Sequence, residues 1–183
     1  MFGRDGKWHT DIFKQKIKEI EIWEIDKKWK LSLEKNFPNS KIRIQDSIKT
    51  LSEKNDFEKF DLILIDNPMN IFSSYNKENS ISYCEHFDII KNVYKLIDKK
   101  AVVVFNINRK PFDYEKYPKW AFRRNNFYNV KDASDLKLEF LKEFYKNYFL
   151  ELGFITIFNE DAVRVTQNNE DMTFYFAYYL ERK

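Results

Sequence analysis

Two short apolar segments constrain the fold of this chain more than any other feature of its sequence. Residues 60–65 read Phe-Asp-Leu-Ile-Leu-Ile, and residues 101–106 read Ala-Val-Val-Val-Phe-Asn. Nearly continuous apolar runs of this length are typical of strands that helices cover on both faces, as in parallel sheets. Helical apolar repeats lie between the two segments and on either side of them. The sequence therefore predicts an α/β fold with a mainly parallel sheet between two helical layers.

The same periodicities predict the other elements. Further strands are expected at residues 20–25, 41–45, 154–158 and 173–180. Helices are expected at residues 29–37, 47–54, 87–97 and 136–152, and irregular chain at residues 66–80 and 110–130. No helix separates the last two strands, so the last strand is expected to run antiparallel to its neighbour in a hairpin at one sheet edge. Together these elements predict a single domain over residues 1–183.

Composition excludes several broad classes of protein. Hydrophobic residues make up 43% of the 183 residues and aromatic residues 18%, which is too apolar for a disordered chain. The 32 basic and 29 acidic side chains leave a net charge of +3, so charge alone favours neither nucleic acid nor a membrane as a partner. No apolar run approaches the ~20 residues of a membrane span, and the N-terminus lacks the apolar core of a signal peptide. A cytoplasmic protein is expected.

The few cysteine and histidine residues indicate neither a disulfide nor a metal site. The chain has one cysteine, Cys84, and two histidines, His9 and His86. A lone cysteine cannot form an internal disulfide, and these three residues lack the spacing of a zinc site. No metal is therefore expected.

Polar side chains follow the predicted parallel strands. In open α/β sheets, ligands bind beyond the carboxyl ends of the strands. The residues at these ends are Glu24 and Asp26, Asp46 and Ser47, Asp66 and Asn67, and Asn106 and Asn108. As a set they indicate a binding site along this edge. Singly, an Asp, Asn or Ser at such a position can equally be the N-cap of the following helix.

Glycine is scarce, and its placement is informative. Of three glycines, Gly3 and Gly6 lie in one short N-terminal segment, and Gly153 follows the last predicted helix, where it is expected to be the C-terminal cap. Because glycine lets a ligand approach the backbone, the N-terminal segment is a candidate binding loop. Its main-chain amides would suit an anionic group.

In order and spacing, these segments resemble the class I S-adenosylmethionine-dependent methyltransferases. That family has a seven-stranded Rossmann-like sheet that ends in an antiparallel hairpin. The matching segments are residues 2–6 (Phe-Gly-Arg-Asp-Gly), 22–26 (Ile-Trp-Glu-Ile-Asp), 44–47 (Ile-Gln-Asp-Ser) and 60–68 (Phe-Asp-Leu-Ile-Leu-Ile-Asp-Asn-Pro). The likeness covers nearly the whole chain, except that the family's first strand, which precedes the glycine loop, is expected to be missing here.

The resemblance implies S-adenosylmethionine as the cofactor. Glu24 would accept hydrogen bonds from both ribose hydroxyls, and Asp46 would accept one from the adenine amine. Asp26 faces the same way as Glu24 along an extended strand, but both Asp26 and Asp46 can instead cap a helix. The complete set of implied cofactor-binding residues is Gly3, Asp5, Gly6, Glu24, Asp26, Asp46, Ser47 and Asp66.

Three residues are candidates for catalysis. Asp66 and Asn67 match the family's motif beside the transferred methyl group and would orient the attacking nucleophile. His86 could act as a general base, because imidazole exchanges a proton near neutral pH, or could be an ordinary residue at a helix start. The second proline and the aromatic residue that many adenine and cytosine N-methyltransferases carry after this motif are absent, which argues against that substrate class.

These observations predict a methyltransferase that acts on an unidentified acceptor: a small molecule, a glycan or a nucleic acid. The acceptor is expected between residues 66–80 and 110–130, with Arg123 and Arg124 as partners for an anionic group. Nucleic acid is not favoured, because acidic residues accompany these bases. Two alternatives remain open: an aminopropyl transferase on the same fold, and a catalytically silent binding or scaffold protein.

Overall fold

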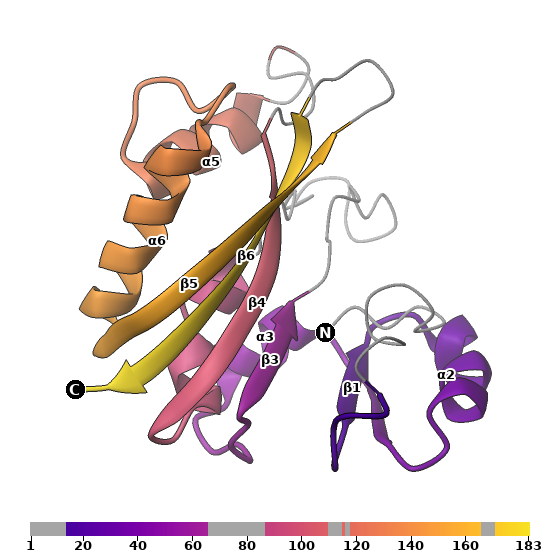
Figure 1. The fold of residues 1–183 in the computed structure, drawn as a ribbon. Helices are drawn as coiled ribbons and strands as arrows, with labels where there is room; N and C mark the ends of the chain where they lie inside the picture. Colours follow the sequence, from indigo (N-terminus) through magenta and orange to yellow (C-terminus); the bar gives the residue numbers. More distant parts are fainter. Residues whose placement is uncertain (1–13, 66–86, 110–114, 116–117, 166–170) are drawn as a thin grey trace. The chain divides into compact units, whose positions relative to one another are not determined.

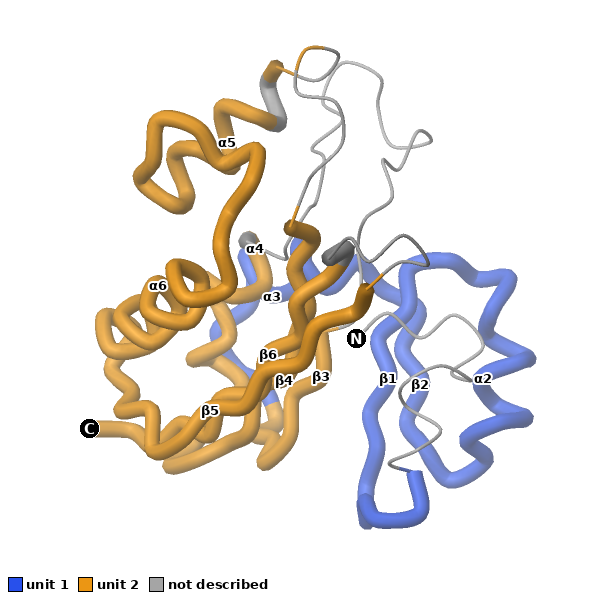
Figure 2. The backbone as a smooth tube through the Cα atoms, turned by 45° about the horizontal axis from the view of Figure 1, so that its top comes forward, with its two compact units in different colours: residues 1–57 blue, residues 58–183 orange. Residues whose placement is uncertain are grey.

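The computed structural model describes residues 14–65, 87–109, 115, 118–165 and 171–183 (Figure 1). The chain divides into two compact units, Met1–Phe57 and Glu58–Lys183 (Figure 2). The expectation of one domain over residues 1–183 stays a prediction. In the described ranges, none of the helices has the length and apolar character that crossing a bilayer requires.

The first unit contains a parallel two-stranded sheet. Its strands are β1 (Glu21–Glu24) and β2 (Lys41–Ile44). The 3-10 helix η1 (Lys27–Trp29) and helix α2 (Lys30–Asn36) connect the strands, and α3 (Ser47–Glu53) follows β2. This arrangement confirms the predicted alternation of strands and helices in this part of the chain.

The predicted apolar repeat forms the core of the first unit. Leu33 and Phe37, four residues apart, are buried together with Ile22 of β1, and Trp29 packs against them. The helix ends where the Phe37 amide bonds the Leu33 carbonyl oxygen at 2.8 Å. Pro38 follows directly and cannot continue a helix.

The second unit is built on a four-stranded sheet with the order β3-β4-β6-β5. Its strands are β3 (Leu62–Ile65), β4 (Lys100–Asn108), β5 (Phe154–Val165) and β6 (Asp171–Arg182). β3 and β4 are parallel, whereas β6 runs antiparallel to both β4 and β5. The predicted antiparallel C-terminal hairpin at a sheet edge is confirmed.

The described part of the chain between β3 and β4 contains two short helices, α4 (Phe87–Ile90) and η2 (Val93–Leu96). The sequence predicts one helix over residues 87–97, and the structure interrupts it at Asn92. The side-chain amide of Asn92 donates to the Asp88 carbonyl oxygen at 3.0 Å, which is the acceptor that its main-chain amide would use in an α-helix. That main-chain amide instead bonds the Ile89 carbonyl oxygen.

Helix α6 (Leu138–Glu151) packs against one face of the four-stranded sheet (Figure 1). Its buried side chains are Leu141, Tyr145 and Phe149, and the Tyr145 ring lies 4.7 Å from the ring of Phe105 in β4. After the helix, Gly153 adopts a φ of +91°, a conformation that glycine tolerates and that confirms its predicted role as a C-terminal cap.

Helix α5 (Pro118–Tyr128) occupies a segment that the sequence predicts to be irregular, and the prediction is wrong over these residues. Two inward positions four residues apart, Arg124 and Tyr128, are both fully buried. Because one of them is a cation, the segment lacks the apolar period by which helices are recognised. Residues 66–80, the other segment predicted to be irregular, lie outside the described residues.

Candidate functional site

The described residues of the predicted cofactor site lie at one edge of the first unit. They are Glu24, Asp26, Asp46 and Ser47. β1 and β2 are parallel, and Glu24 lies opposite Ile44, so both strands end at the same edge. The Gln45 main-chain amide bonds the Glu24 carbonyl oxygen at 2.8 Å and extends the pairing beyond the strands. This carboxyl edge is where open α/β sheets bind ligands.

Glu24 is a buried carboxylate at the end of β1. Glu24 is 4% exposed, and its Oε1 accepts a hydrogen bond from the Asp26 main-chain amide at 2.9 Å. This bond orients the carboxylate relative to the chain that leaves the strand. An ionised carboxylate has about four lone-pair sites and can accept several hydrogen bonds at once.

The other two carboxylates at this edge are helix caps. Asp26 accepts from the Lys28 main-chain amide at 3.0 Å and pairs with the Lys28 ammonium at 2.7 Å. The hydrogen bond from the Lys28 side chain, and after it the one from the Lys28 main-chain amide, hold the pKa of Asp26 below its ordinary value. Asp46 accepts from the main-chain amides of Ile48 and Lys49 at 2.9 and 3.1 Å, at the start of α3. The capping interpretation therefore accounts for both residues, whereas Glu24 is the N-cap of none of the described helices.

A second buried carboxylate on β1, Glu21, has a structural role that the sequence analysis missed. It contacts Arg43 at 2.6 Å and Lys41 at 3.1 Å, both on the neighbouring strand, and accepts from the Trp23 indole at 2.5 Å. Burial raises the pKa of the Glu21 carboxyl, but the three hydrogen bonds outweigh it and leave the pKa lowered. The cross-strand pattern of one acid against two bases is the signal that could have revealed this cluster.

The remaining predicted site residues lie outside the described residues, so their roles stay predictions. They are Gly3, Asp5, Gly6, Asp66, Asn67 and His86. Cys84 also lies there. Among the residues that the structure does describe, no three His, Cys, Asp or Glu side chains gather as metal ligands.

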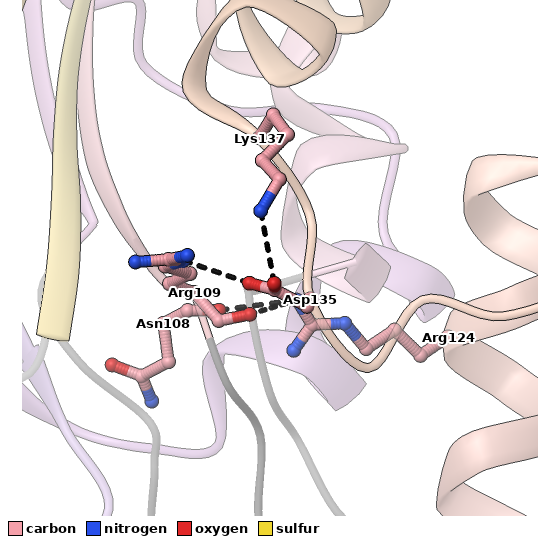
Figure 3. A network of polar contacts seen from close by, with 5 residues as sticks. All are labelled: Asn108, Arg109, Arg124, Asp135 and Lys137. Carbon is pink, nitrogen blue, oxygen red and sulfur yellow. Dashed lines mark hydrogen bonds and ion pairs between the residues drawn. The ribbon is translucent and has the colours of Figure 1, made fainter. Parts of the chain in front are cut away.

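In the second unit, a polar network surrounds the carboxyl end of β4 (Figure 3). The fully buried Arg124 of α5 donates through Nη2 to the carbonyl oxygens of Asn108 at 3.1 Å and Arg109 at 3.3 Å. One guanidinium group thus ties α5 to the last residue of the strand and to the residue after it. The side chain of Asn108 accepts from the Thr173 hydroxyl at 3.2 Å, which links β4 to β6 at the same end.

Asp135 completes this network from the chain that precedes α6. Its carboxylate contacts Lys137 Nζ at 2.9 Å and Arg109 Nε at 2.7 Å (Figure 3). The hydrogen bond from Lys137 and then that from Arg109 lower the pKa of Asp135 from its ordinary 3.8 to about 2. The residue after β4 is therefore held from two directions, by Arg124 and by Asp135.

The lowered pKa of Asp135 predicts an acid-dependent contribution to stability. A carboxyl group whose pKa is lower in the folded than in the unfolded protein stabilises the folded state at every pH above its unfolded pKa. This stabilisation is lost as the pH falls through the folded pKa. We expect Asp135→Asn to cost less than about 1 kcal/mol, because the side chain is 40% exposed. The cost should be constant above pH 5 and disappear between pH 4 and 2. Urea denaturation of both proteins across this range measures it, and a cost that grows toward pH 2 would contradict the ion pairs.

Arg123 and Arg124 do not form the predicted anion site. Arg124 donates to main-chain carbonyls, and Arg123 Nη2 bonds Asp88 Oδ2 at 2.7 Å. Both guanidinium groups are thus engaged within the second unit. This finding removes the main structural reason for expecting an anionic acceptor at this helix.

Comparison with solved structures identifies the fold. No family model and no curated protein matches this sequence. The structure of M. jannaschii TYW2 in complex with AdoMet aligns over 100% of this chain and 67% of its own, with 12% identity and a TM-score of 0.59. The plantazolicin methyltransferase BamL in complex with SAH aligns over 99% and 75%, with 9% identity and a TM-score of 0.56. This chain has the class I methyltransferase fold.

A SAM-dependent methyltransferase from Methanosarcina mazei shares that fold over 99% of this chain and 89% of its own, with 10% identity and a TM-score of 0.53. The predicted fold class is therefore confirmed. In a methyltransferase fold the carboxyl ends of the parallel strands carry the ligand-binding residues. Glu24 in the first unit and Asn108 in the second lie at such ends.

Proposed function

We propose that this chain binds S-adenosylmethionine and transfers its methyl group to an acceptor. The observation that carries the proposal is Glu24, a buried carboxylate at the carboxyl end of a parallel strand, within a methyltransferase fold. TYW2 and BamL, which share the fold, were crystallised with AdoMet and SAH.

Each cofactor contact follows from the chemistry of the side chains. The Glu24 carboxylate would accept hydrogen bonds from the two ribose hydroxyls, while Oε1 keeps its bond to the Asp26 amide. Asp46 would accept from the adenine amine with the oxygen that does not cap α3. Asp26 and Ser47 would act by fixing the chain on either side.

The cofactor supplies a methyl group on a positively charged sulfur atom, which makes the methyl carbon electrophilic. The chain has to place an acceptor lone pair in line with the breaking sulfur–carbon bond and to remove a proton where the acceptor carries one. Positioning of this kind accounts for several kcal/mol of a transfer barrier. We assign the positioning of the acceptor to Asp66 and Asn67, and the removal of its proton to His86.

We further propose an acceptor without a phosphate group. The guanidinium groups of Arg123 and Arg124, the two arginines of the predicted acceptor segment, are held by Asp88 and by main-chain carbonyls. A small molecule or a glycan therefore suits this chain better than a nucleic acid. A cytoplasmic location remains the expectation from the sequence.

Transfer of labelled methyl groups tests this function. We expect the full chain, given methyl-labelled S-adenosylmethionine and fractionated cell extract, to label a fraction that survives nuclease treatment. The product should gain the mass of one methyl group, whereas an aminopropyl transferase would add a larger group. Asn67→Ala should reduce labelling at least tenfold while leaving cofactor binding unchanged, because Asn67 is assigned to the acceptor. Cofactor binding without any labelled product would support a silent binding protein instead.

A further inference from the structure

Strand β5 presents an unusually long edge. It forms one side of the four-stranded sheet, spans Phe154–Val165, and pairs with β6 alone among the described strands. An edge strand carries a row of main-chain amides and carbonyls that can pair with another extended chain. Two register shifts, at Thr156/Phe158 and Arg164/Val165, leave a regular ladder from Phe158 to Arg164 between them. This regular stretch is the part of the edge that is suited to pairing.

Exposed apolar side chains concentrate on the same strand. The described large apolar residues with high exposure on β5 are Ile155, Ile157, Phe158, Val163 and Val165, each between 38% and 53% exposed. Edge strands that stay unpaired usually carry few such side chains, since they invite association. Ile155 and Phe158 lie on the face that also carries Ala162, whereas Val163 lies on the other face, where Asp161 pairs with Lys142 of α6 at 2.5 Å.

We propose that the β5 edge pairs with the β5 edge of a second copy of this chain, antiparallel and about a two-fold axis at Ala162. In this register Glu160 of each copy lies opposite Arg164 of the other, so the symmetric pair contains two opposite-charge contacts. Glu160, Ala162 and Arg164 are all exposed and share one face of the strand. An isologous contact of this kind closes on itself and gives a dimer rather than a fibre.

Charge selects this register over its neighbours. An axis at residue 160 would place Glu160 opposite its own copy, and an axis at residue 164 would do the same with Arg164. Like charges directly opposite each other destabilise an antiparallel pair, whereas opposite charges stabilise it. An axis at residue 161 or 163 places neither charge opposite a complementary one. The axis at Ala162 places each charge opposite a complementary one.

A cysteine at the axis tests the register directly. In a Cys84→Ser background, Ala162→Cys should form an intermolecular disulfide under mild oxidation, because residues opposite each other at the axis have Cα atoms about 4.5–5.5 Å apart. Phe158→Cys is the matched control. In the proposed register the two copies of residue 158 are eight positions apart, roughly 27 Å, and should not crosslink. Equal crosslinking of both variants would overturn the proposal.

Charge exchange tests the same contact without cysteine. Sedimentation velocity should show a dimer for the unmodified chain, and Glu160→Arg and Arg164→Glu should each raise its dissociation constant at least tenfold. An equimolar mixture of the two variants should restore the dimer, because every cross-copy pair is then complementary. Lys146→Glu, which reverses an exposed charge on α6, is the control. A monomer at all concentrations, or single variants that dimerise like the unmodified chain, would overturn the proposal.

Discussion

Replacing Arg124 with alanine is expected to destabilise the second unit by roughly 3 kcal/mol. The side chain is fully buried and donates to two consecutive main-chain carbonyls at the end of β4. Its removal leaves buried acceptors without this donor, each at about 1–3 kcal/mol, and opens a cavity beside Tyr128. Urea denaturation followed by circular dichroism measures the loss.

Two control variants separate this effect from loss of charge alone. Arg123→Ala removes the neighbouring guanidinium, which is partly exposed and pairs with Asp88, and should cost under about 1 kcal/mol. Arg124→Lys keeps the charge but not the planar group that reaches both carbonyls, and should fall between the two alanine variants. If Arg124→Ala cost no more than Arg123→Ala, the network at the end of β4 would not have the role assigned to it.

Replacing Glu24 with glutamine is expected to weaken S-adenosylmethionine binding by roughly 10- to 100-fold. Hydrogen bonds to a charged acceptor contribute about 1.5–3 kcal/mol, and glutamine presents one acceptor oxygen and no charge. It preserves the shape of a buried side chain and the acceptor for the Asp26 amide, so folding should be retained. Equilibrium dialysis with labelled cofactor measures the change.

Glu21→Gln is the matched control on the same strand. Glu21 is also a buried carboxylate, but its partners are Arg43, Lys41 and Trp23 rather than a ligand. This variant should lower the free energy of unfolding of the first unit and leave cofactor affinity within about twofold. Equal losses of affinity in both variants would mean that the effect of Glu24→Gln reflects damage to the sheet.

The sequence predicts the strands of this fold well because their signals are local. The apolar run before Asp66 and the run at residues 101–106 correspond to β3 and β4, and the helix repeat of Leu33 and Phe37 forms a core as expected. β5 extends to Val165 rather than residue 158, because its far half is an exposed edge held by main-chain pairing with β6 and needs no apolar pattern. Helix α5 is not predicted because one of its two inward positions is Arg124, which breaks the apolar period.

The sequence predicts the site residues only where they directly follow a recognisable strand. Glu24 and Asp46 are recognisable because they directly follow strand patterns, and the sequence already offers capping as one role for Asp46. The contacts of Arg124 with Asn108 and of Arg109 with Asp135 join residues 16 and 26 positions apart. No periodicity encodes such pairs, because they depend on how α5 and the chain before α6 return to the end of β4.

Calorimetric titration of S-adenosylmethionine into the full chain tests the proposed function most directly. We expect one cofactor molecule to bind per chain, with the affinity lowered by Glu24→Gln and unchanged by Glu21→Gln. S-adenosylhomocysteine should compete for the same site, since the ribose hydroxyls that Glu24 would hold are common to both molecules. Absence of binding heat in the unmodified chain at several temperatures, together with no competition in dialysis, would contradict the assignment of this chain as a methyltransferase.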